Sequence, residues 1–235
     1  MLQPALYLIP VTLSDGTHER VLPQANVLVV RQIRHFVVEN VRSARRFLKA
    51  CDRDIDIDAL TFVELNRHTR PADVEAMLEP LARGEAVGVL SEAGCPAVAD
   101  PGADLVAIAQ RRGYVVRPLV GPSSILLGLM ASGFNGQRFA FEGYLPIEAG
   151  ARGRRLKEMT RRIEHDDQTQ IFIETPYRND RLVDELCRVL PPSLRLCVAT
   201  DLTGDNERVE TRTIAQWRKS PARPGKVPTI FLLYK

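Results

Sequence analysis

The residues best suited to ligand chemistry lie in one loop, residues 91–102, which reads Ser-Glu-Ala-Gly-Cys-Pro-Ala-Val-Ala-Asp-Pro-Gly. It follows the apolar run Ala86–Leu90, which predicts a buried strand, and it ends at Asp100-Pro101, a favourable start for a helix. Connections between a strand and a helix usually have about 2–6 residues, and this one is longer. Its glycines let a ligand approach the backbone, and its prolines stiffen the loop. We therefore predict a ligand-binding loop at the carboxyl end of a strand, with an ordinary connection as the alternative.

A second group of residues with chemical potential is the basic segment 152–162. It holds six cations, and Glu158 is its one acidic residue. Helical spacing would place Arg154, Lys157 and Arg161 on one face. Such a face is suited to contact a nucleic-acid phosphate backbone, and a solvated surface helix is the alternative interpretation.

The composition limits the possible classes of protein. The chain has 235 residues, of which 45% are hydrophobic and 26% charged, as in ordinary globular proteins. Its net charge of +3 is too small to imply nucleic-acid binding by itself. Because no apolar run approaches the ~18 residues that span a bilayer and no secretory signal is visible, we expect a cytoplasmic protein without a membrane partner.

The cysteines and histidines show no metal-binding pattern. The four cysteines lack Cys-x-x-Cys spacing and the four histidines, among them His68, are dispersed. We predict free structural thiols and no metal site.

Alternation of strand and helix patterns predicts an α/β protein of two α/β domains, residues 1–118 and 119–235. The predicted strands are Ala5–Pro10, Phe36–Val38, Leu60–Leu65, Ala86–Leu90, Tyr114–Leu119, Phe139–Tyr144, Gln170–Ile173, Arg195–Thr200, Glu207–Thr213 and Val227–Tyr234. The predicted helices include Val21–Ile33, Arg42–Ala50, Pro71–Ala82, Ile125–Ser132 and Arg178–Val189. The closing strands should be antiparallel or mixed, because their connections around Gly204 and Gly225 are too short for helical crossovers.

Four loops at predicted strand ends, Pro10–Gly16, Ser91–Gly102, Gly121–Ser124 and Glu174–Arg178, together resemble the tetrapyrrole-methylase superfamily. The likeness is strongest to its small-subunit ribosomal RNA methyltransferase I family, whose Ser-Asp-Ala-Gly-Thr-Pro loop is similar to the chain from Ser91 onward. That family's Pro-Gly-Pro-Cys/Ser and Glu-Ser-Thr-His-Arg motifs look like the third and fourth loops.

Two further motifs of that family extend the likeness. Its Tyr-Glu-Gly-Phe-Leu-Pro segment resembles Phe141–Pro146, and a basic Lys-Gly-Arg-Arg stretch resembles Arg152–Arg155. Its Ala-Glu-Asp-Thr-Arg element is more loosely similar to Val38–Arg42. The likeness ends with Lys235, so we expect a short form without the family's further C-terminal domain.

The resemblance implies two α/β domains with a cofactor cleft between them, S-adenosylmethionine as cofactor, RNA as substrate, a homodimer, and possible action on the small ribosomal subunit. It implies cofactor contacts by Pro10, Glu92, Ala93, Gly94, Ser123, Ser124, Ala199, Pro228 and Thr229. Structural alternatives remain open: Glu92 as a helix cap or solvent-facing carboxylate, the serines as helix caps, and Thr229 as an ordinary strand residue.

Methyl transfer needs an aligned donor and acceptor and, for a hydroxyl acceptor, a group that removes a proton. Glu39 and Glu174 are the candidate catalytic carboxylates, and the sequence does not choose between them. The candidate substrate-binding residues are Arg42, Arg152, Arg154, Arg155, Lys157 and Arg178. The pairs Glu39–Arg42 and Glu174–Arg178 are equally interpretable as ion pairs or caps near helix starts.

Three functions therefore remain. The favoured one is an S-adenosylmethionine-dependent RNA methyltransferase acting on a ribose 2′-oxygen of ribosomal RNA, as the resemblance implies. The second is a methyltransferase of a tetrapyrrole or other small molecule. The third is a protein that binds S-adenosylmethionine without catalysing transfer.

Overall fold

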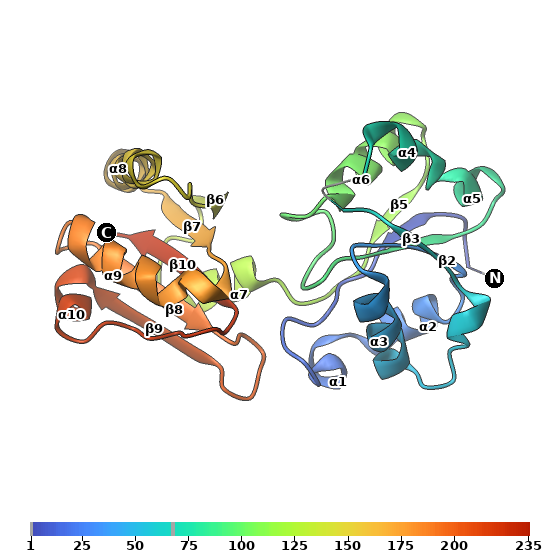
Figure 1. Ribbon diagram of the computed structural model, residues 1–235, viewed down its shortest axis with the longest axis horizontal. Coiled ribbons are helices and arrows are strands. Elements are labelled where there is room, and N and C mark those ends of the chain that lie inside the picture. Colours follow the sequence, from blue (N-terminus) through green and yellow to red (C-terminus); the bar gives the residue numbers. More distant parts are fainter. Residues whose placement is uncertain (1, 67–68) are drawn as a thin grey trace. The chain divides into compact units, whose positions relative to one another are not determined.

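The computed structural model describes residues 2–66 and 69–235, and the chain forms two compact units (Figure 1). Unit 1 ends at Ser123, and unit 2 runs from Ser124 to Lys235. In the described part of the chain, no helix is both long enough and apolar enough to span a membrane.

Unit 1 is built on a parallel sheet with the strand order β3-β2-β4-β1-β5. The strands are β1 (Leu6–Leu8), β2 (His35–Val38), β3 (Thr61–Glu64), β4 (Val87–Leu90) and β5 (Val116–Pro118). The helices are α1 (His18–Val21), α2 (Gln24–Val30), α3 (Val41–Cys51), α4 (Pro71–Ala76), α5 (Glu79–Ala82) and α6 (Gly102–Arg111), with a 3-10 turn at Ile57–Ala59. Because neighbouring strands run in the same direction, all their carboxyl ends meet at one edge.

Two hydrophobic clusters cover the two faces of this sheet. Tyr7 and Phe36 pack with Phe47 of α3 on one face. Leu6 and Val87 pack with Leu105 of α6 on the other. Because side chains alternate between the two faces of a strand, these nearly continuous apolar runs place hydrophobic side chains on both faces of the sheet.

Unit 2 is built on a mixed sheet with the order β6-β7-β10-β8-β9. Its strands are β6 (Phe139–Tyr144), β7 (Thr169–Ile173), β8 (Arg195–Thr200), β9 (Arg208–Thr213) and β10 (Thr229–Tyr234). Its helices are α7 (Ser124–Ser132), α8 (Ala149–Asp166), α9 (Asn179–Val189) and α10 (Ile214–Lys219), with a 3-10 turn η2 (Pro176–Arg178). Strands β6 and β7 are parallel, and β10 and β8 pair antiparallel with their neighbours. The predicted mixed or antiparallel closing strands are confirmed.

The central strand β10 separates the two layers of unit 2. Phe231 and Leu233 pack in the main core with Leu156 of α8, Leu186 of α9 and Trp217 of α10. The alternate residue Ile230 lies against Gly128 of α7 on the other face.

Two predicted helices are wrong because each contains a proline. The predicted helix Val21–Ile33 is interrupted at Leu22-Pro23, where Leu22 is extended, because the residue before a proline disfavours the helical conformation. The predicted helix Pro71–Ala82 divides into α4 and α5 because Pro80 cannot donate a hydrogen bond to the carbonyl of Ala76.

Alanine substitutions at two glycines should change the stability of the protein in opposite directions, and so test the packing of the two units. A Cβ at Gly88 of β4 would lie 2.9 Å from Ile9 Cδ1 and 2.9 Å from the Phe36 ring, whereas a Cβ at Gly153 of α8 would meet nothing within 4 Å. We expect Gly88→Ala to lower the free energy of unfolding by about 1–3 kcal/mol through overpacking. Gly153→Ala should raise it by about 0.5–1 kcal/mol, because alanine restricts the unfolded chain. Denaturant unfolding measures both, and a stable Gly88→Ala protein would contradict the described packing.

Candidate functional site

Three of the predicted cofactor loops converge at the carboxyl edge of the sheet in unit 1. They follow β1, β4 and β5, which are neighbours in the sheet. The Val11 N–H donates to the Gly94 carbonyl at 2.9 Å, and the Gly94 N–H donates back to Val11 at 3.1 Å. The Cys95 thiol lies 3.5 Å from the Pro122 carbonyl oxygen, to which it donates. The parallel sheet thus brings Pro10, Gly94 and the segment before Ser123 into one group.

Glycine is required at two contacts in this group. Gly94 has a φ of +71°, a conformation that other residues rarely adopt. A Cβ on Gly121 would overlap the ring of Pro10. The backbones of the first and third loops therefore touch, and side-chain-free positions make that approach possible.

The Ser91–Gly102 loop is held in a strained conformation by Asp100. Ala97 and Ala99 have φ values of 66° and 59°, unusual for residues other than glycine. Asp100 Oδ1 accepts hydrogen bonds from the N–H groups of Ala97 at 2.9 Å and Gly102 at 2.7 Å. The carboxylate thus joins the loop to the start of α6, whose N-cap residue is Pro101.

Glu39 and Glu92 lie close together, beyond β2 and β4. The Glu92 N–H lies 3.4 Å from Glu39 Oε2, and the Ser43 hydroxyl donates to Glu92 Oε2 at 3.1 Å. With Asp100 they line an open cavity of about 770 Å³, whose remaining wall is formed by Asn40, Asn66, Ala99 and Pro101. Burial raises the pKa of Glu39, and the nearby carboxylates of Glu92 and Asp100 raise it further, against a hydrogen bond from the Glu92 N–H. Glu39 thus has a raised proton affinity and an opening to a cavity.

Arg42 lies at the start of α3, where Asn40 caps the helix. Asn40 Oδ1 accepts from the N–H groups of Arg42 at 2.9 Å and Ser43 at 3.2 Å. Among the residues that the structure describes, the exposed Arg42 guanidinium has no ion-pair partner, so the alternative of a Glu39–Arg42 pair is not what the structure has.

In unit 2, the predicted cofactor residues Ala199, Pro228 and Thr229 lie at neighbouring ends of β8 and β10. Ala199 pairs with Ile230 and is buried. The Pro228 carbonyl accepts from the Asp201 N–H at 3.0 Å, beside Ala199 in the sheet. The Thr229 hydroxyl donates to the Val227 carbonyl at 2.9 Å, so its polar atom is engaged within the fold. Ser124 is the first residue of α7, and Ser123 precedes it.

Glu174 and Arg178 form an ion pair after β7 in which the carboxylate is buried and the guanidinium is partly exposed. Glu174 Oε1 accepts from Arg178 Nη2 at 2.6 Å, from Arg178 Nε at 3.0 Å and from the Thr175 N–H at 2.6 Å. Only 6% of the Glu174 side chain is exposed. The ion-pair interpretation of these two residues is therefore the one that the structure has.

The basic helix α8 divides into paired and unpaired cations. Arg152 binds Glu185 through two contacts of 2.6 and 3.0 Å and donates to the carbonyls of Pro146 and Ile147. Arg155 and Arg162 both contact the buried carboxylate of Glu142 and also Glu158. The sequence prediction counted only Glu158 as opposing charge, because Glu142 and Glu185 belong to distant elements.

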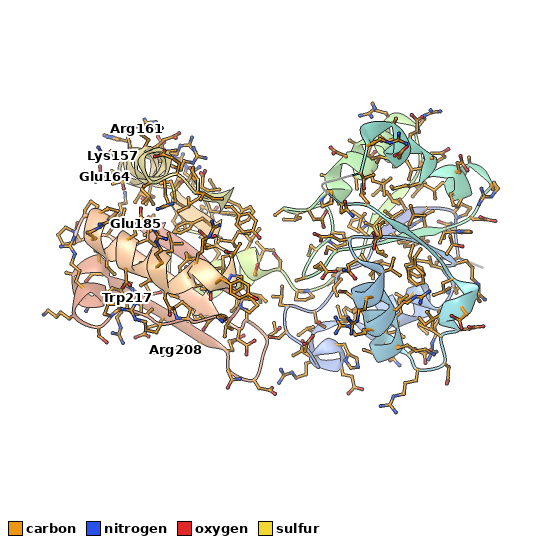
Figure 2. The ribbon with its side chains drawn as sticks, viewed as in Figure 1. Lys157, Arg161, Glu164, Glu185, Arg208 and Trp217 are labelled. Atoms are coloured by element: carbon orange, nitrogen blue, oxygen red, sulfur yellow. The ribbon has the colours of Figure 1, made fainter. Side chains whose placement is uncertain are left out.

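Arg154, Lys157 and Arg161 form the exposed face of α8. Within residues 2–66 and 69–235 none of them has an ion-pair partner. Figure 2 shows Lys157 and Arg161 directed away from the sheet of unit 2. The three cations that helical spacing grouped together are thus the ones left available for a ligand.

Sequence reasoning missed Asn179, the first residue of α9. Its side chain is completely buried, and Nδ2 donates to the carbonyls of Gly225 and Val227 and to the Thr229 hydroxyl. The one signal in the sequence was the position of this asparagine beside a predicted helix start. That position does not predict a contact with the loop at residues 225–227, almost fifty positions later.

Metal ligation was not predicted, and in the described part of the chain no group of three or more His, Cys, Asp or Glu residues is placed to hold a metal ion. His68 lies outside the described residues. The thiols of Cys51 and Cys197 have pKa values raised to about 11 by burial, and all four cysteines are free.

Comparison with known proteins identifies the family. Residues 19–217 match the family described as Tetrapyrrole (Corrin/Porphyrin) Methylases. The chain belongs to this family. The ribosomal RNA small subunit methyltransferase I of Vibrio cholerae is 28% identical over 213 residues, 91% of this chain and 70% of that relative.

Solved structures agree on the fold. A diphthine synthase has a TM-score of 0.66 at 17% identity, covering 97% of this chain and 89% of its own. A uroporphyrin-III C-methyltransferase of Thermus thermophilus, complexed with S-adenosylhomocysteine, has a TM-score of 0.56 at 16% identity, covering 98% of this chain and 97% of its own. The predicted family and α/β fold are confirmed. As a member of this family, the chain is a methyltransferase whose methyl donor is S-adenosylmethionine.

The contact between Gly121 and Pro10 provides a test of the three-loop group. We expect Gly121→Ala to push the first and third loops apart and to weaken S-adenosylmethionine binding about tenfold, equivalent to about 1.4 kcal/mol. Titration calorimetry measures the affinity, with Gly153→Ala as the control because its Cβ meets no neighbour. Unchanged affinity in a folded Gly121→Ala protein would exclude this group from the donor site.

The raised pKa of Glu39 makes the stability of unit 1 depend on pH. Because the native state favours the protonated form, this carboxyl stabilises the fold at low pH and loses that contribution as pH rises above its ordinary value of 4.5. Glu39→Gln, which is neutral at every pH, should therefore be more stable than the natural protein at pH 7 and equally stable near pH 4. Denaturant unfolding across pH 4–8 measures the difference, and parallel curves would contradict the described burial.

Proposed function

We propose that the chain transfers the methyl group of S-adenosylmethionine to RNA, with a ribose 2′-oxygen of small-subunit ribosomal RNA as the acceptor. The observation that carries the RNA assignment is the exposed face of Arg154, Lys157 and Arg161 on α8, which have no ion-pair partner among the residues that the structure describes. Phosphate groups are its natural ligands, because the cations need not leave a protein partner to bind them. The name of the Vibrio cholerae relative supports small-subunit ribosomal RNA as the substrate.

The proposed donor-binding residues form two groups. Pro10, Glu92, Ala93, Gly94 and Ser123 belong to the loops of unit 1. Ser124, Ala199, Pro228 and Thr229 belong to unit 2. Most residues of both groups are small, so their backbone can come close to a ligand with a polar amino-acid end and a flat adenine. That both groups hold one cofactor stays a prediction.

Methyl transfer to a hydroxyl is an in-line displacement. The acceptor oxygen forms a bond to the methyl carbon as the carbon–sulfur bond breaks, which leaves S-adenosylhomocysteine. The hydroxyl proton must pass to a base. We propose Glu39 for this role, because its carboxylate opens to a cavity and has a raised pKa. Glu174 is less suited to it, because Arg178 and the Thr175 N–H bind its Oε1 and only 6% of its side chain is exposed.

We assign the proposed substrate contacts by whether each cation is paired with a carboxylate of the fold. Arg42, Arg154 and Lys157 are available to bind RNA directly. Arg152, Arg155 and Arg178 are engaged with carboxylates of the fold, so we assign them to holding the surface in place. A cytoplasmic homodimer completes the proposal and follows from the family resemblance and the RNA substrate.

The exposed cation face gives a direct test of the RNA assignment. Replacing Arg154, Lys157 and Arg161 together by Gln should weaken RNA binding and lower the slope of log affinity against log salt by about 2, since each phosphate contact on a single strand contributes about 0.7. Filter binding at several salt concentrations measures the slope. Arg162→Gln is the matched control, because this cation is paired with Glu142 and Glu158 and its loss should affect stability more than the salt slope.

Transfer of labelled methyl groups to total RNA, to small ribosomal subunits and to a porphyrinoid identifies the acceptor. Label on the porphyrinoid alone would replace the RNA assignment with a tetrapyrrole substrate. Tight donor binding without any labelled product would indicate a protein that binds the cofactor without transferring it.

A further inference from the structure

An exposed aromatic side chain lies in the fourth motif and has no role in the proposed reaction. Tyr177, in the 3-10 turn between β7 and α9, is 81% exposed. The Lys226 ammonium lies 5.4 Å from the centroid of its ring, a cation–π distance. A large ring left in water beside a cation is suited to bind a flat, electron-rich group of a ligand.

Hydrogen bonds link the two segments of the chain that carry Tyr177 and Lys226. Asn179 Nδ2 donates to the carbonyls of Gly225 at 3.2 Å and Val227 at 2.8 Å, on either side of Lys226. Asp180 Oδ1 accepts from the Gly225 N–H at 2.8 Å. Because Asn179 and Asp180 follow Tyr177 almost directly, these bonds attach the Lys226 loop to the segment that carries the ring. The two backbone segments from which the ring and the ammonium extend are therefore held next to each other.

A second available cation, Arg181 on α9, follows Tyr177 by four residues in the chain. Arg181 is exposed, and in the part of the chain that the structure describes it has no ion-pair partner. It lines a cavity of about 190 Å³ with Arg152, Arg178 and Glu185. The acidic residues of that cavity are neutralised, Glu174 by Arg178 and Glu185 by Arg152. The charge left over in that cavity is therefore positive and is carried by Arg181.

We propose that Tyr177, Arg181 and Lys226 form a binding patch for an unpaired segment of RNA, in which a base stacks on the Tyr177 ring and the two cations contact flanking phosphates. We call these three residues the Tyr177 patch. The proposal rests on the proposed RNA substrate and adds that the substrate is presented as a single strand. Aromatic side chains reach bases only where the bases are unstacked, whereas in a duplex they stack on each other.

Binding of a labelled single-stranded oligoribonucleotide and of a hairpin duplex, measured by fluorescence anisotropy with the full chain, tests the Tyr177 patch. Tyr177→Ala should weaken single-strand binding about 5- to 100-fold, the usual range for loss of one base–aromatic stack, and should leave duplex binding nearly unchanged. Tyr177→Phe keeps the ring and should bind single strands nearly as well as the natural protein.

The lysine of the patch has a matched control in the same unit. Lys226→Gln should weaken single-strand binding about 2- to 5-fold, since it loses one phosphate contact and the cation on the ring. Lys219→Gln removes an exposed lysine on α10 and should change nothing. Equal effects of the two variants would indicate a general loss of charge and would overturn the role of Lys226.

The outcomes separate this inference from the proposed function. If the natural protein methylates RNA and Tyr177→Ala binds single strands as well as it does, the Tyr177 patch is wrong and the RNA substrate stands. An equal loss for single strand and duplex would also overturn stacking. If the natural protein binds neither RNA and methylates a porphyrinoid, the proposed RNA substrate fails, and the patch fails with it.

Discussion

The parallel direction of the strands in unit 1 is the constraint on which the candidate site depends. Since β4, β1 and β5 are adjacent and run the same way, the loops that follow them must share one edge. The reciprocal hydrogen bonds between Val11 and Gly94 then fix the first loop to the second. The absent side chain at Gly121 allows the third loop to reach Pro10. The contact of three loops at one edge of the sheet therefore follows from sheet topology together with two glycines.

Charge pairing decides which parts of the surface are free to bind. Glu142 is buried beneath α8, and an isolated carboxylate there would be strongly destabilising, so Arg155 and Arg162 are committed to it. Glu185 engages Arg152 in the same way. A basic helix that looks uniform in sequence is therefore divided into cations that hold the fold and cations that face solvent. The same principle separates Arg178 from Arg181 after β7.

The two glutamates that the sequence offered as candidate bases show how identical side chains acquire different chemistry. Glu174 is close to its partner in sequence, and the short Arg178 contact keeps its carboxylate engaged. Burial raises the pKa of Glu39, and the carboxylates of Glu92 and Asp100, which lie beyond β4, raise it further. Position relative to charge therefore distinguishes them, since their side chains are identical.

The sequence by itself determined the family, the α/β class and most strands, because apolar runs, capping residues and glycine–proline loops are local signals. The helix predictions failed where a proline interrupts an apolar helical pattern, at Pro23 and Pro80. The sequence also could not show which residues far apart in the chain pair with each other. Only the tertiary structure decided that Glu142 occupies two arginines, that Asn179 holds the Lys226 loop against Tyr177, and that Glu39 lies near Glu92. The physical reason is that ion pairing and burial depend on distances across the fold, which the order of residues along the chain does not specify.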